Sequence, residues 1–560
     1  MGKIKRLDDH LTNMIAAGEV VERPSAVLKE LIENALDAHA KYIEIKIEQG
    51  GIKKLEVIDD GDGMDESDVK LAFDRHSTSK ISQVRELFAP LTLGFRGEAL
   101  PSIASVSKVS LKSSNGQEGA AIIIDNGVIV SYHPQLGPQG TSVIVENLFQ
   151  KVPARFKHLK SIQYEASLLL DLVEKFALSY RNVAFKVSNE DKVLLKTSGN
   201  GSWEDVLAYI MGNRLAHLAH TYTFEDHDFS LDVCYIEPSE HRSNPKNIYL
   251  FINHRIIRHY SIQKVIVEAF SSYLPAHRYP IICINITMDA SLVDVNVHPS
   301  KWEVKLSKEQ QLTYLIYDSL VKQFKTEGSI KDHTLIPSSE LSEQIPFFDT
   351  YSYQAPQDND SILAEVNSNQ TSFPVLDVLG QLHGQYILAS SPSTLYIIDQ
   401  HAAKERINFE SILKQMTNTK QRDLLLPLVI EVKPSFSQRM DDFNQALEYL
   451  MIQVEPFSIN SIIIRKLPLW ISVDNQEQFI LNLIDRFLED KPLTMTEVRH
   501  STIATMACHK SVRFNQNLSH IEMKHIIEEL SQCDQPYNCP HGRPTLIKIE
   551  TKDLWKDFER

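Results

Sequence analysis

The chain has 560 residues, of which 42% are hydrophobic and 23% are charged, with a formal net charge of −15. This length excludes a single hydrophobic core and predicts three or more domains of ordinary globular composition. The acidic balance excludes a uniformly basic surface for nucleic acid, no apolar run approaches a membrane span, and five cysteines are too few for a disulfide framework, so we expect a cytoplasmic protein.

An amphipathic helix is predicted near the N-terminus, beginning at Pro24. Proline is tolerated at a first helical position, and apolar residues then recur at helical spacing up to Leu36. Glu30, Asn34 and Asp37 are spaced i, i+4 and i+7, so they share another face of this helix. Mg²⁺ prefers oxygen ligands such as Asn34 and a triphosphate, which leaves Glu30 free to deprotonate an attacking water. The alternative is a solvated polar face, the commoner outcome on amphipathic helices.

A strand is predicted over residues 54–58, and it leads into an acidic turn that contains Asp59, Gly61 and Gly63. Glycine permits backbone conformations and close approaches that other residues do not. A carboxylate in such a turn can accept a hydrogen bond from an exocyclic amine such as that of adenine, while the base lies against main chain. The alternative is a tight hairpin turn, in which Asp-Gly is common.

Two further polar segments, residues 75–80 and 93–100, bring glycines, cations and backbone amides that suit phosphate binding. A Gly-Thr pair at 140–141 is a weaker signal of the same kind. Each segment is unspecific alone, but their order along the chain is specific. The candidate nucleotide contacts in these segments are Lys80, Gly94, Phe95, Arg96, Gly97 and Thr141.

Together these segments resemble the N-terminal ATPase of the MutL mismatch-repair family, which belongs to the GHKL superfamily with DNA gyrase B, the heat-shock chaperone and histidine kinases. Residues 16–24, 28–38, 75–80 and 94–100 carry the resemblance. It implies a GHKL (Bergerat) α/β sandwich over residues 1–197, with ATP and Mg²⁺ as cofactors. It also implies that Glu30 is the general base, Asn34 the Mg²⁺ ligand and Asp59 the adenine reader. Residues 94–97 would form the hinge of the ATP lid.

A second α/β unit, a transducer domain, is expected over residues 198–326. A strand is predicted over residues 294–297 and ends before Pro299. In the family that the chain resembles, the lysine after the His-Pro turn reaches the γ-phosphate, which implies this role for Lys301; the alternative is an exposed lysine after a turn. Two basic clusters are candidates for weak, salt-sensitive DNA contact, or else are solvated faces. They are Lys151, Arg155, Lys157, His158 and Lys160, and Arg255, Arg258, His259 and Lys264.

Residues 327–374 are rich in Ser, Gln, Asp, Asn and Pro, which predicts a flexible linker. After it, a predicted strand over residues 394–398 delivers Asp399 into a helix on which His401 and Glu405 share one face. Near the end of the chain, Cys539 and His541 flank a proline in a turn. Such side chains are ligands for zinc or manganese, and Cys508 is a further candidate. The alternatives are a buried thiol in a turn and an ordinary exposed His–Glu pair.

Residues 399–410 and 539–544 are similar to the two metal motifs of the nicking MutL proteins. The resemblance implies an α+β dimerisation and endonuclease domain over residues 375–560, with a regulatory subdomain around 434–494. Its implied catalytic residues are Asp399 and Glu405. Two positions depart from the family pattern: His509 stands where arginine is usual, and Arg422 stands where the sliding-clamp motif has glutamine. The implied ligands of a Mn²⁺ and/or Zn²⁺ site are Asp399, His401, Glu405, Cys508, Cys539 and His541.

The sequence therefore predicts a multidomain α/β and α+β protein of the MutL type, which combines an ATPase with metal-dependent DNA nicking. The resemblance implies a homodimer whose partners are DNA, the mismatch-recognition protein MutS and, through an imperfect motif, a sliding clamp. The alternatives are an ATP-switched matchmaker without nuclease activity, a type II topoisomerase subunit and a chaperone of the same superfamily. The two C-terminal metal motifs favour the nicking protein over all three.

Overall fold

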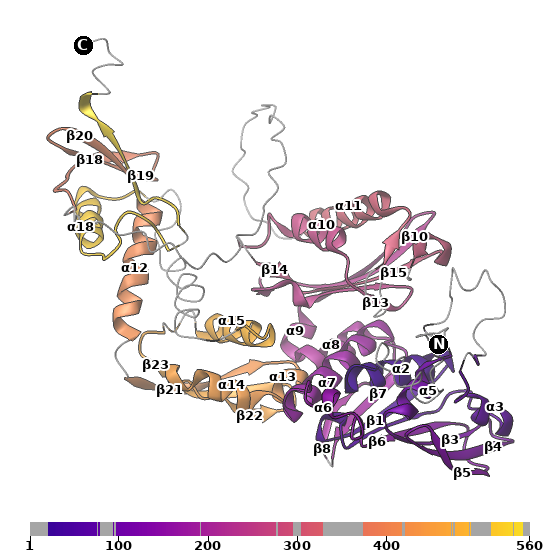
Figure 1. Cartoon of the computed structure of the whole chain (residues 1–560). Helices are drawn as coiled ribbons and strands as arrows, with labels where there is room; N and C mark the ends of the chain where they lie inside the picture. The colour runs from indigo at the N-terminus through magenta and orange to yellow at the C-terminus, as the bar shows by residue number, and fades with distance from the viewer. Residues whose placement is uncertain are drawn as a thin grey trace, which may run out of the picture. The chain divides into compact units, whose positions relative to one another are not determined.

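The structure is a computed structural model, and its described parts fall into two compact units (Figure 1). The first unit comprises Met1–Val321 together with Met416–Val498, and the second comprises Lys322–Gln415 together with Arg499–Arg560. The described residues are 21–75, 77–78, 93, 97–190, 192–275, 278–294, 304–328, 373–416, 420–471, 473, 476–491, 493, 517–540 and 542–552.

The N-terminal part of the first unit is built on an eight-stranded sheet with the order β5-β4-β3-β6-β2-β1-β7-β8. Its pairs are antiparallel except β1 with β7, whose connection contains most of the helices. The strands are β1 (Tyr42–Glu48), β2 (Lys54–Asp59), β3 (Lys108–Ser114), β4 (Gly119–Asp125), β5 (Val128–Pro134), β6 (Gly140–Glu146), β7 (Ala184–Asn189) and β8 (Lys192–Lys196). The helices are α2 (Pro24–Asp37), η1 (Gln49–Gly51), α3 (Glu66–Leu71), α5 (Ala99–Ser105), α6 (Pro153–Phe156) and α7 (Ile162–Ser179).

Helices α2, α5 and α7 cover one face of this sheet (Figure 1). Helix α2 begins at Pro24, as its sequence predicts, and its apolar stripe, which includes Leu28 and Ile32, is fully buried. Alternate residues of β1, among them Ile43 and Ile45, point into the same core. Each such buried side chain contributes roughly 1.5–3 kcal/mol, so the stripe fixes which face of α2 turns away from the sheet.

A second sheet follows, with the order β13-β12-β15-β10-β9. Its strands are β9 (Ala219–Glu225), β10 (Phe229–Ile236), β12 (Ile248–Ile252), β13 (Arg255–Ile257) and β15 (Ile282–Met288). The helices are α8 (Trp203–Met211), α9 (Asn213–His217), η2 (Pro245–Asn247), α10 (Tyr260–Phe270), η3 (Ala290–Leu292) and α11 (Glu309–Gly328). The short pairs are β11 (His241–Arg242) with β14 (Tyr279–Pro280), and β16 (Val293–Asp294) with β17 (Lys305–Leu306). The strand predicted at 294–297 thus begins one residue earlier, and its later residues lie outside the described part.

The remaining part of the first unit is a three-stranded sheet, β21-β23-β22, with four helices. We call residues 421–490 the inserted subdomain, because chain segments assigned to the second unit precede and follow it. Its elements are β21 (Gln421–Glu431), α13 (Pro434–Ser437), α14 (Met440–Leu447), η4 (Glu448–Leu450), β22 (Glu455–Ser458), β23 (Ser461–Pro468) and α15 (Gln476–Leu488).

The second unit holds a four-stranded sheet, β18-β19-β20-β24. Helix α18 packs against one face, where its Ile526 and Leu530 join Ile387 and Ile398 in a buried cluster. The elements are β18 (Asp377–Leu382), β19 (Tyr386–Ser391), β20 (Thr394–Asp399), α12 (Gln400–Met416), α18 (His520–Ser531) and β24 (Leu546–Glu550). The predicted multidomain fold class, with an α/β domain at the N-terminus, is confirmed. In the described part of the chain, no helix is long and apolar enough to cross a membrane.

Candidate functional site

Three acidic residues lie at and just after the end of β2, and the structure gives each a different task. Asp60 Oδ1 accepts hydrogen bonds from the backbone N–H groups of Lys41 (2.7 Å) and Tyr42 (2.8 Å), so it ties the turn to β1. Asp62 pairs with His39 at 2.7 Å on the exposed side of the turn. Asp59 is partly buried, and it accepts from the N–H of Gly61 at 3.0 Å. Burial raises the pKa of Asp59 to about 6, against smaller lowering effects of the Gly61 and Thr141 backbone N–H groups.

The glycines after Asp59 are required by close backbone contacts. Gly63 has φ of +71°, and a Cβ there would lie 1.9 Å from the Ser114 carbonyl oxygen. Gly140 has φ of +126°, and its Cβ would lie 2.1 Å from the Asp59 carbonyl oxygen. The hairpin alternative is wrong, because β2 pairs with β1 and β6 and the turn leads into α3. Only glycine lets two strands and this turn meet around Asp59.

A hydroxyl pair supports the turn from β3 and β6. Thr141 Oγ1 lies 2.8 Å from Ser113 Oγ, and Ser113 Oγ accepts from the N–H of Met64 at 2.9 Å. Thr141 was a predicted nucleotide contact, and the structure places it opposite Asp59 in the β2–β6 pairing. Ser113 was missed by the sequence analysis. No motif marks it, because its role depends on the register of two strands that are distant along the chain.

The polar face of α2 carries Glu30, Asn34 and Asp37, all partly exposed, as the helical spacing predicts. Asp37 Oδ1 accepts from the N–H of Leu93 at 2.9 Å, and Arg255 Nη1 of β13 donates to the carbonyl oxygen of Leu93 at 3.2 Å. Leu93 immediately precedes the predicted lid glycine. Arg255, which the sequence analysis grouped with a basic cluster, therefore ties the second sheet to Leu93.

Several predicted nucleotide contacts lie outside the described residues: Lys80, Gly94, Phe95, Arg96 and Lys301. Gly97 is described, has φ of +60°, and approaches Ser77 so closely that a Cβ would lie 2.5 Å from its carbonyl oxygen.

The C-terminal candidate site is centred on the junction of β20 and α12. Asp399 ends β20, and its Oδ1 accepts from the N–H groups of His401 (2.9 Å) and Ala402 (3.0 Å), which caps the first turn of α12. His401 Nε2 lies 3.2 Å from Glu405 Oε1, one helical turn further on. The predicted sharing of one helix face by His401 and Glu405 is thus observed.

The Cys-Pro-His segment is anchored to the same junction. The N–H of Asp399 donates to the carbonyl oxygen of Thr545 at 2.9 Å, and Arg406 Nε of α12 donates to the carbonyl oxygen of Asn538. The turn between these anchors begins with the buried Cys539, whose N–H donates to the carbonyl oxygen of Arg543 at 2.8 Å. Residues more than 130 positions apart in sequence thereby meet around one helix start.

The described residues do not by themselves complete a metal site. No three His, Cys, Asp or Glu side chains among them are grouped so that they could hold an ion. The predicted ligands Cys508 and His541 lie outside the described residues, as does His509. The donor set that is described, with two carboxylates, an imidazole and a thiol, is chemically suited to zinc or manganese.

Parts of both predicted basic clusters are neutralised. Lys160 pairs with Asp490 at 3.0 Å and Lys151 with Asp125 at 4.0 Å. His259 lies 3.9 Å from Glu309 in the second cluster. These carboxylates reduce the positive potential available for DNA at each cluster.

Comparison with known proteins covers the whole chain. Residues 22–125 match the family described as histidine kinase-, DNA gyrase B-, and HSP90-like ATPase, residues 207–325 match the DNA mismatch repair protein C-terminal domain, and residues 379–518 match the MutL C terminal dimerisation domain. The chain is 35% identical to the DNA mismatch repair protein MutL of Staphylococcus carnosus and 37% identical to that of Anoxybacillus flavithermus, with 100% of each chain covered in both cases. A solved N-terminal domain of a DNA repair protein has a TM-score of 0.50 and 24% identity, over 57% of this chain and 99% of that one, which shows a shared fold.

Proposed function

The chain belongs to the MutL family of DNA mismatch-repair proteins, with an N-terminal GHKL ATPase and a C-terminal dimerisation domain, and from this premise we propose that it uses ATP to control the nicking of one DNA strand. The proposed domains are the ATPase over residues 1–197, the transducer over 198–326, a linker over 327–374 and the endonuclease domain over 375–560. The observation that supports the nicking proposal is that Asp399, His401 and Glu405 lie at the start of α12, where Arg406 donates to the carbonyl oxygen of Asn538, the residue before Cys539.

In the ATPase, the proposed adenine reader is Asp59, because its carboxylate is partly buried beside glycines that let a base approach the main chain. Glu30 and Asn34 project from the face of α2 that does not enter the core, one turn apart. Asn34 would supply an oxygen ligand to Mg²⁺, which neutralises triphosphate charge when bound. Glu30 would accept the proton of the attacking water.

In the endonuclease domain, Asp399, His401, Glu405 and Cys539 would hold Zn²⁺ or Mn²⁺, with Cys508 and His541 as further ligands. A bound divalent ion supplies a water of lowered pKa and charge stabilisation for the phosphodiester. The backbone N–H groups at the start of α12 fix the Asp399 carboxylate, so it would be held in place before an ion binds.

Replacement of Asp399 by asparagine tests the nicking proposal with little effect on the fold. Asparagine also caps helices, so the start of α12 should be preserved while the anionic oxygen is lost. We expect Mn²⁺-dependent nicking of supercoiled plasmid to fall by about a hundredfold or more, with ATP hydrolysis unchanged. Glu30→Ala should do the reverse, abolishing ATP hydrolysis while retaining nucleotide binding and basal nicking. Wild-type nicking by Asp399→Asn would exclude Asp399 as a catalytic metal ligand.

The matchmaker without nuclease activity remains the second candidate function. Metal analysis of purified protein separates the two, because a matchmaker would bind no stoichiometric Mn²⁺ or Zn²⁺ that Asp399→Asn or Cys539→Ala removes.

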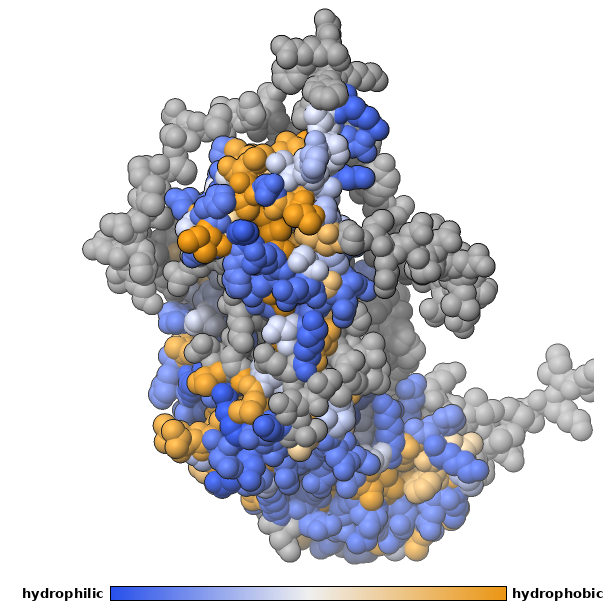
Figure 2. Space-filling model, turned by 90° about the vertical axis from the view of Figure 1, so that its left-hand side faces the viewer, coloured by the Kyte–Doolittle hydropathy of each residue, from blue (hydrophilic) through white to orange (hydrophobic). Residues whose placement is uncertain are grey.

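Homodimerisation is proposed to use the face of the second unit's sheet that α18 does not cover. Figure 2 shows a hydrophobic patch on this unit, and its strands carry exposed Leu382, Tyr386 and Ile547. Ile547 pairs with Ile397, and both alternate with residues of the buried cluster, so they point to the opposite face. An apolar sheet face of this kind suits a symmetric contact with a second copy.

The proposed macromolecular partners are DNA, MutS and the sliding clamp. For the clamp, β21 loses its pairing with β23 between Asp423 and Leu428, and Leu425 and Leu426 are almost fully exposed there. Arg422, which replaces the expected glutamine, donates to the carbonyl oxygen of Ile471 at 2.9 Å and so points back into the subdomain. The apolar part of the motif is therefore presented to solvent, whereas its polar first position is not.

A further inference from the structure

The inserted subdomain packs against the ATPase and transducer parts of the first unit through polar side chains. We propose that this contact is a docking interface that opens and closes, whose two sides belong to one chain. Its N-terminal side, the docking surface, is formed by Lys160, Tyr164, Glu174, Ser243 and Arg278. Its partner is residues 433–490 of the inserted subdomain. The proposal is independent of the ATPase and nuclease proposals, because it concerns a contact and not a reaction.

The first contact is a buried carboxylate on α7. Glu174 Oε1 accepts from the N–H of Ser435 at 2.9 Å, and Glu174 Oε2 accepts from the Ser435 hydroxyl at 3.1 Å. Beside it, Lys433 hydrogen-bonds to the Tyr249 hydroxyl. Burying an unpaired carboxylate costs several kcal/mol, so Glu174 is compatible with burial because the inserted subdomain supplies these donors.

The second contact is made by α15. Asp485 Oδ2 accepts from both the N–H (3.0 Å) and the hydroxyl (2.9 Å) of Ser243. Arg278 Nη1 donates to Asn482 Oδ1 at 2.7 Å. Asp485, Asn482 and Arg278 are all buried. Asp485 and Asn482 of α15 thus each meet a complementary group on the transducer part.

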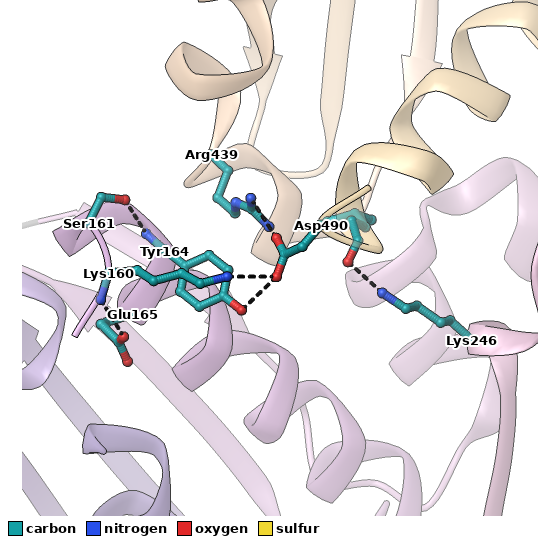
Figure 3. Close-up of polar contacts among 8 residues, drawn as sticks. Lys160, Ser161, Tyr164, Glu165, Lys246, Arg439 and Asp490 are labelled. Carbon is teal, nitrogen blue, oxygen red and sulfur yellow. Dashed lines mark hydrogen bonds and ion pairs between the residues drawn. The ribbon is translucent and has the colours of Figure 1, made fainter. Parts of the chain in front are cut away.

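The third contact surrounds Asp490 (Figure 3). Asp490 Oδ2 lies 3.0 Å from Lys160 Nζ and accepts from the Tyr164 hydroxyl at 2.8 Å, and Arg439 Nη2 donates to Asp490 Oδ1 at 3.0 Å. Lys246 donates to the carbonyl oxygen of Leu488 nearby. Asp490 has a left-handed backbone with φ of +54°, which a non-glycine residue adopts at some cost. The surrounding donors compensate for that conformation.

The composition of the contact indicates that it can open. Among the described residues, the core cluster shared by the ATPase and transducer parts contains no residue of the inserted subdomain. The three contacts consist of hydrogen bonds, ion pairs and the cation–π contacts of Lys433 with Tyr249 and of Arg439 with Tyr164. Their polar groups would be solvated by water after separation. Interfaces between domains of one chain that separate are of this polar kind. Docking should therefore weaken with salt.

The position of α7 connects this contact to the nucleotide site. Helix α7 packs against α13 of the inserted subdomain and also against α2, which carries Glu30 and Asn34. A change in the docking of the inserted subdomain is therefore transmitted to α2 through a single helix, α7. By linkage, a nucleotide that alters docking must have its own affinity altered by docking to the same extent.

Zero-length crosslinking of the full-length protein tests the contact directly. A carbodiimide joins a lysine amine to a carboxylate only when the two touch, and the Lys160 and Asp490 side chains are both partly exposed, at 53% and 35%. We expect mass spectrometry to detect a Lys160–Asp490 amide at 50 mM salt and at least tenfold less of it at 500 mM. The Lys404–Glu529 pair, at 2.9 Å within the second unit, is the internal reference for reagent activity. Absence of the Lys160–Asp490 product while the reference product forms would overturn the proposal.

Two variants keep the crosslinked pair intact but disturb the other contacts. Asp485→Lys places a cation at Ser243, and Ser435→Glu places a second carboxylate against Glu174. Each should reduce the Lys160–Asp490 product at least tenfold, whereas Asp441→Lys, on the exposed side of α14, should leave it unchanged. Circular dichroism melting identifies a variant that fails to fold. If one variant fails to fold, the crosslink yield of the other variant tests the proposal. Unchanged yield in a folded variant contradicts the proposal.

Isotope mixing determines whether both sides belong to one chain. Unlabelled and ¹⁵N-labelled protein are mixed, allowed to exchange subunits and crosslinked, with exchange verified by native mass spectrometry. If the inserted subdomain docks within its own chain, the two peptides of every crosslinked pair are either both labelled or both unlabelled. Mixed-label pairs at half of the total would show that the inserted subdomain docks on the second copy, which overturns the assignment to one chain.

Discussion

At Asp59, the carboxylate that is partly removed from water is also the one proposed to bind adenine. Removal from water raises its pKa to about 6, so near neutral pH most molecules carry the charged form that accepts a hydrogen bond from an amine. The charged form is the costly one in the folded protein. Stability from this group is therefore greatest below the unfolded pKa and decreases as the pH rises through about 6.

Adenine nucleotide binding should depend on the Asp59 charge in the opposite direction. If the exocyclic amine donates to this carboxylate, affinity should fall as the pH drops below about 6, by up to about tenfold per pH unit. Asp59→Asn should bind more weakly at pH 7.5 but lose this dependence, because a carboxamide does not titrate. Isothermal titration calorimetry between pH 5 and 8 measures the nucleotide affinity of the wild type and of Asp59→Asn. The titration of the nucleotide phosphates affects both proteins equally, so it cancels in the difference between their affinities. Parallel pH profiles would remove Asp59 from the adenine contact.

Single residues show which placements a local sequence pattern predicts and which it does not. Asp59, Glu30 and Asn34 were singled out because local spacing places them, and helices and strands preserve local spacing. Ser113 and Arg255 were missed or given another role, because they act on residues that are 49 and 162 positions away. Such contacts depend on strand order, which no local pattern encodes.

At the scale of elements, the predicted helix at α2 and the predicted strands at β2 and β20 agree with the structure, because apolar periodicity reports burial directly. The sequence also predicts a helix that begins directly after β20, and this helix is α12. The alternative interpretation of the segment after β2, a tight hairpin turn, was wrong. The Asp-Gly signal is local, whereas the pairing of β2 with β6 is determined by a strand that begins 80 residues later.

The glycine at the start of β6 should be indispensable to the ATP site. Gly140→Ala forces a Cβ toward the Asp59 carbonyl oxygen at a left-handed φ, so we expect a loss of about 2 kcal/mol or more of unfolding free energy. Gly137→Ala, three residues earlier, is the matched control, because nothing lies within 4 Å of a Cβ there. Chemical denaturation of both variants measures the contrast. Equal stability of the two would mean that the turn is not constrained as described.

At the scale of the whole molecule, assembly should depend on the uncovered sheet face of the second unit. Ile547→Lys introduces a charge at a side chain that is 52% exposed, so the fold should survive while dimerisation weakens by about 2 kcal/mol, roughly thirtyfold. Ile521→Lys is the control, because Ile521 is 80% exposed on α18, which covers the other face. Light scattering coupled to gel filtration, without nucleotide, measures the dimer fraction. A dimer equally stable in both variants would place the interface elsewhere.

The contact between Glu174 and Ser435 has a consequence for the intact protein. Docking of the inserted subdomain is coupled to the binding of a proton by the Glu174 carboxylate. Burial, and then Asp171, raises the pKa of Glu174 to about 7, while Lys433 and Ser435 oppose the rise. In water the same carboxylate would titrate near its ordinary value, so closing the contact takes up a proton. Closure should be favoured below about pH 4.5 and lose that contribution as the pH rises through 7. Glu174→Gln should remove this dependence, measured as the Lys160–Asp490 crosslink relative to the Lys404–Glu529 reference between pH 5 and 7.5. The protein would thus release its inserted subdomain more readily in mildly alkaline solution, and the same rise in pH charges Asp59, the proposed adenine reader.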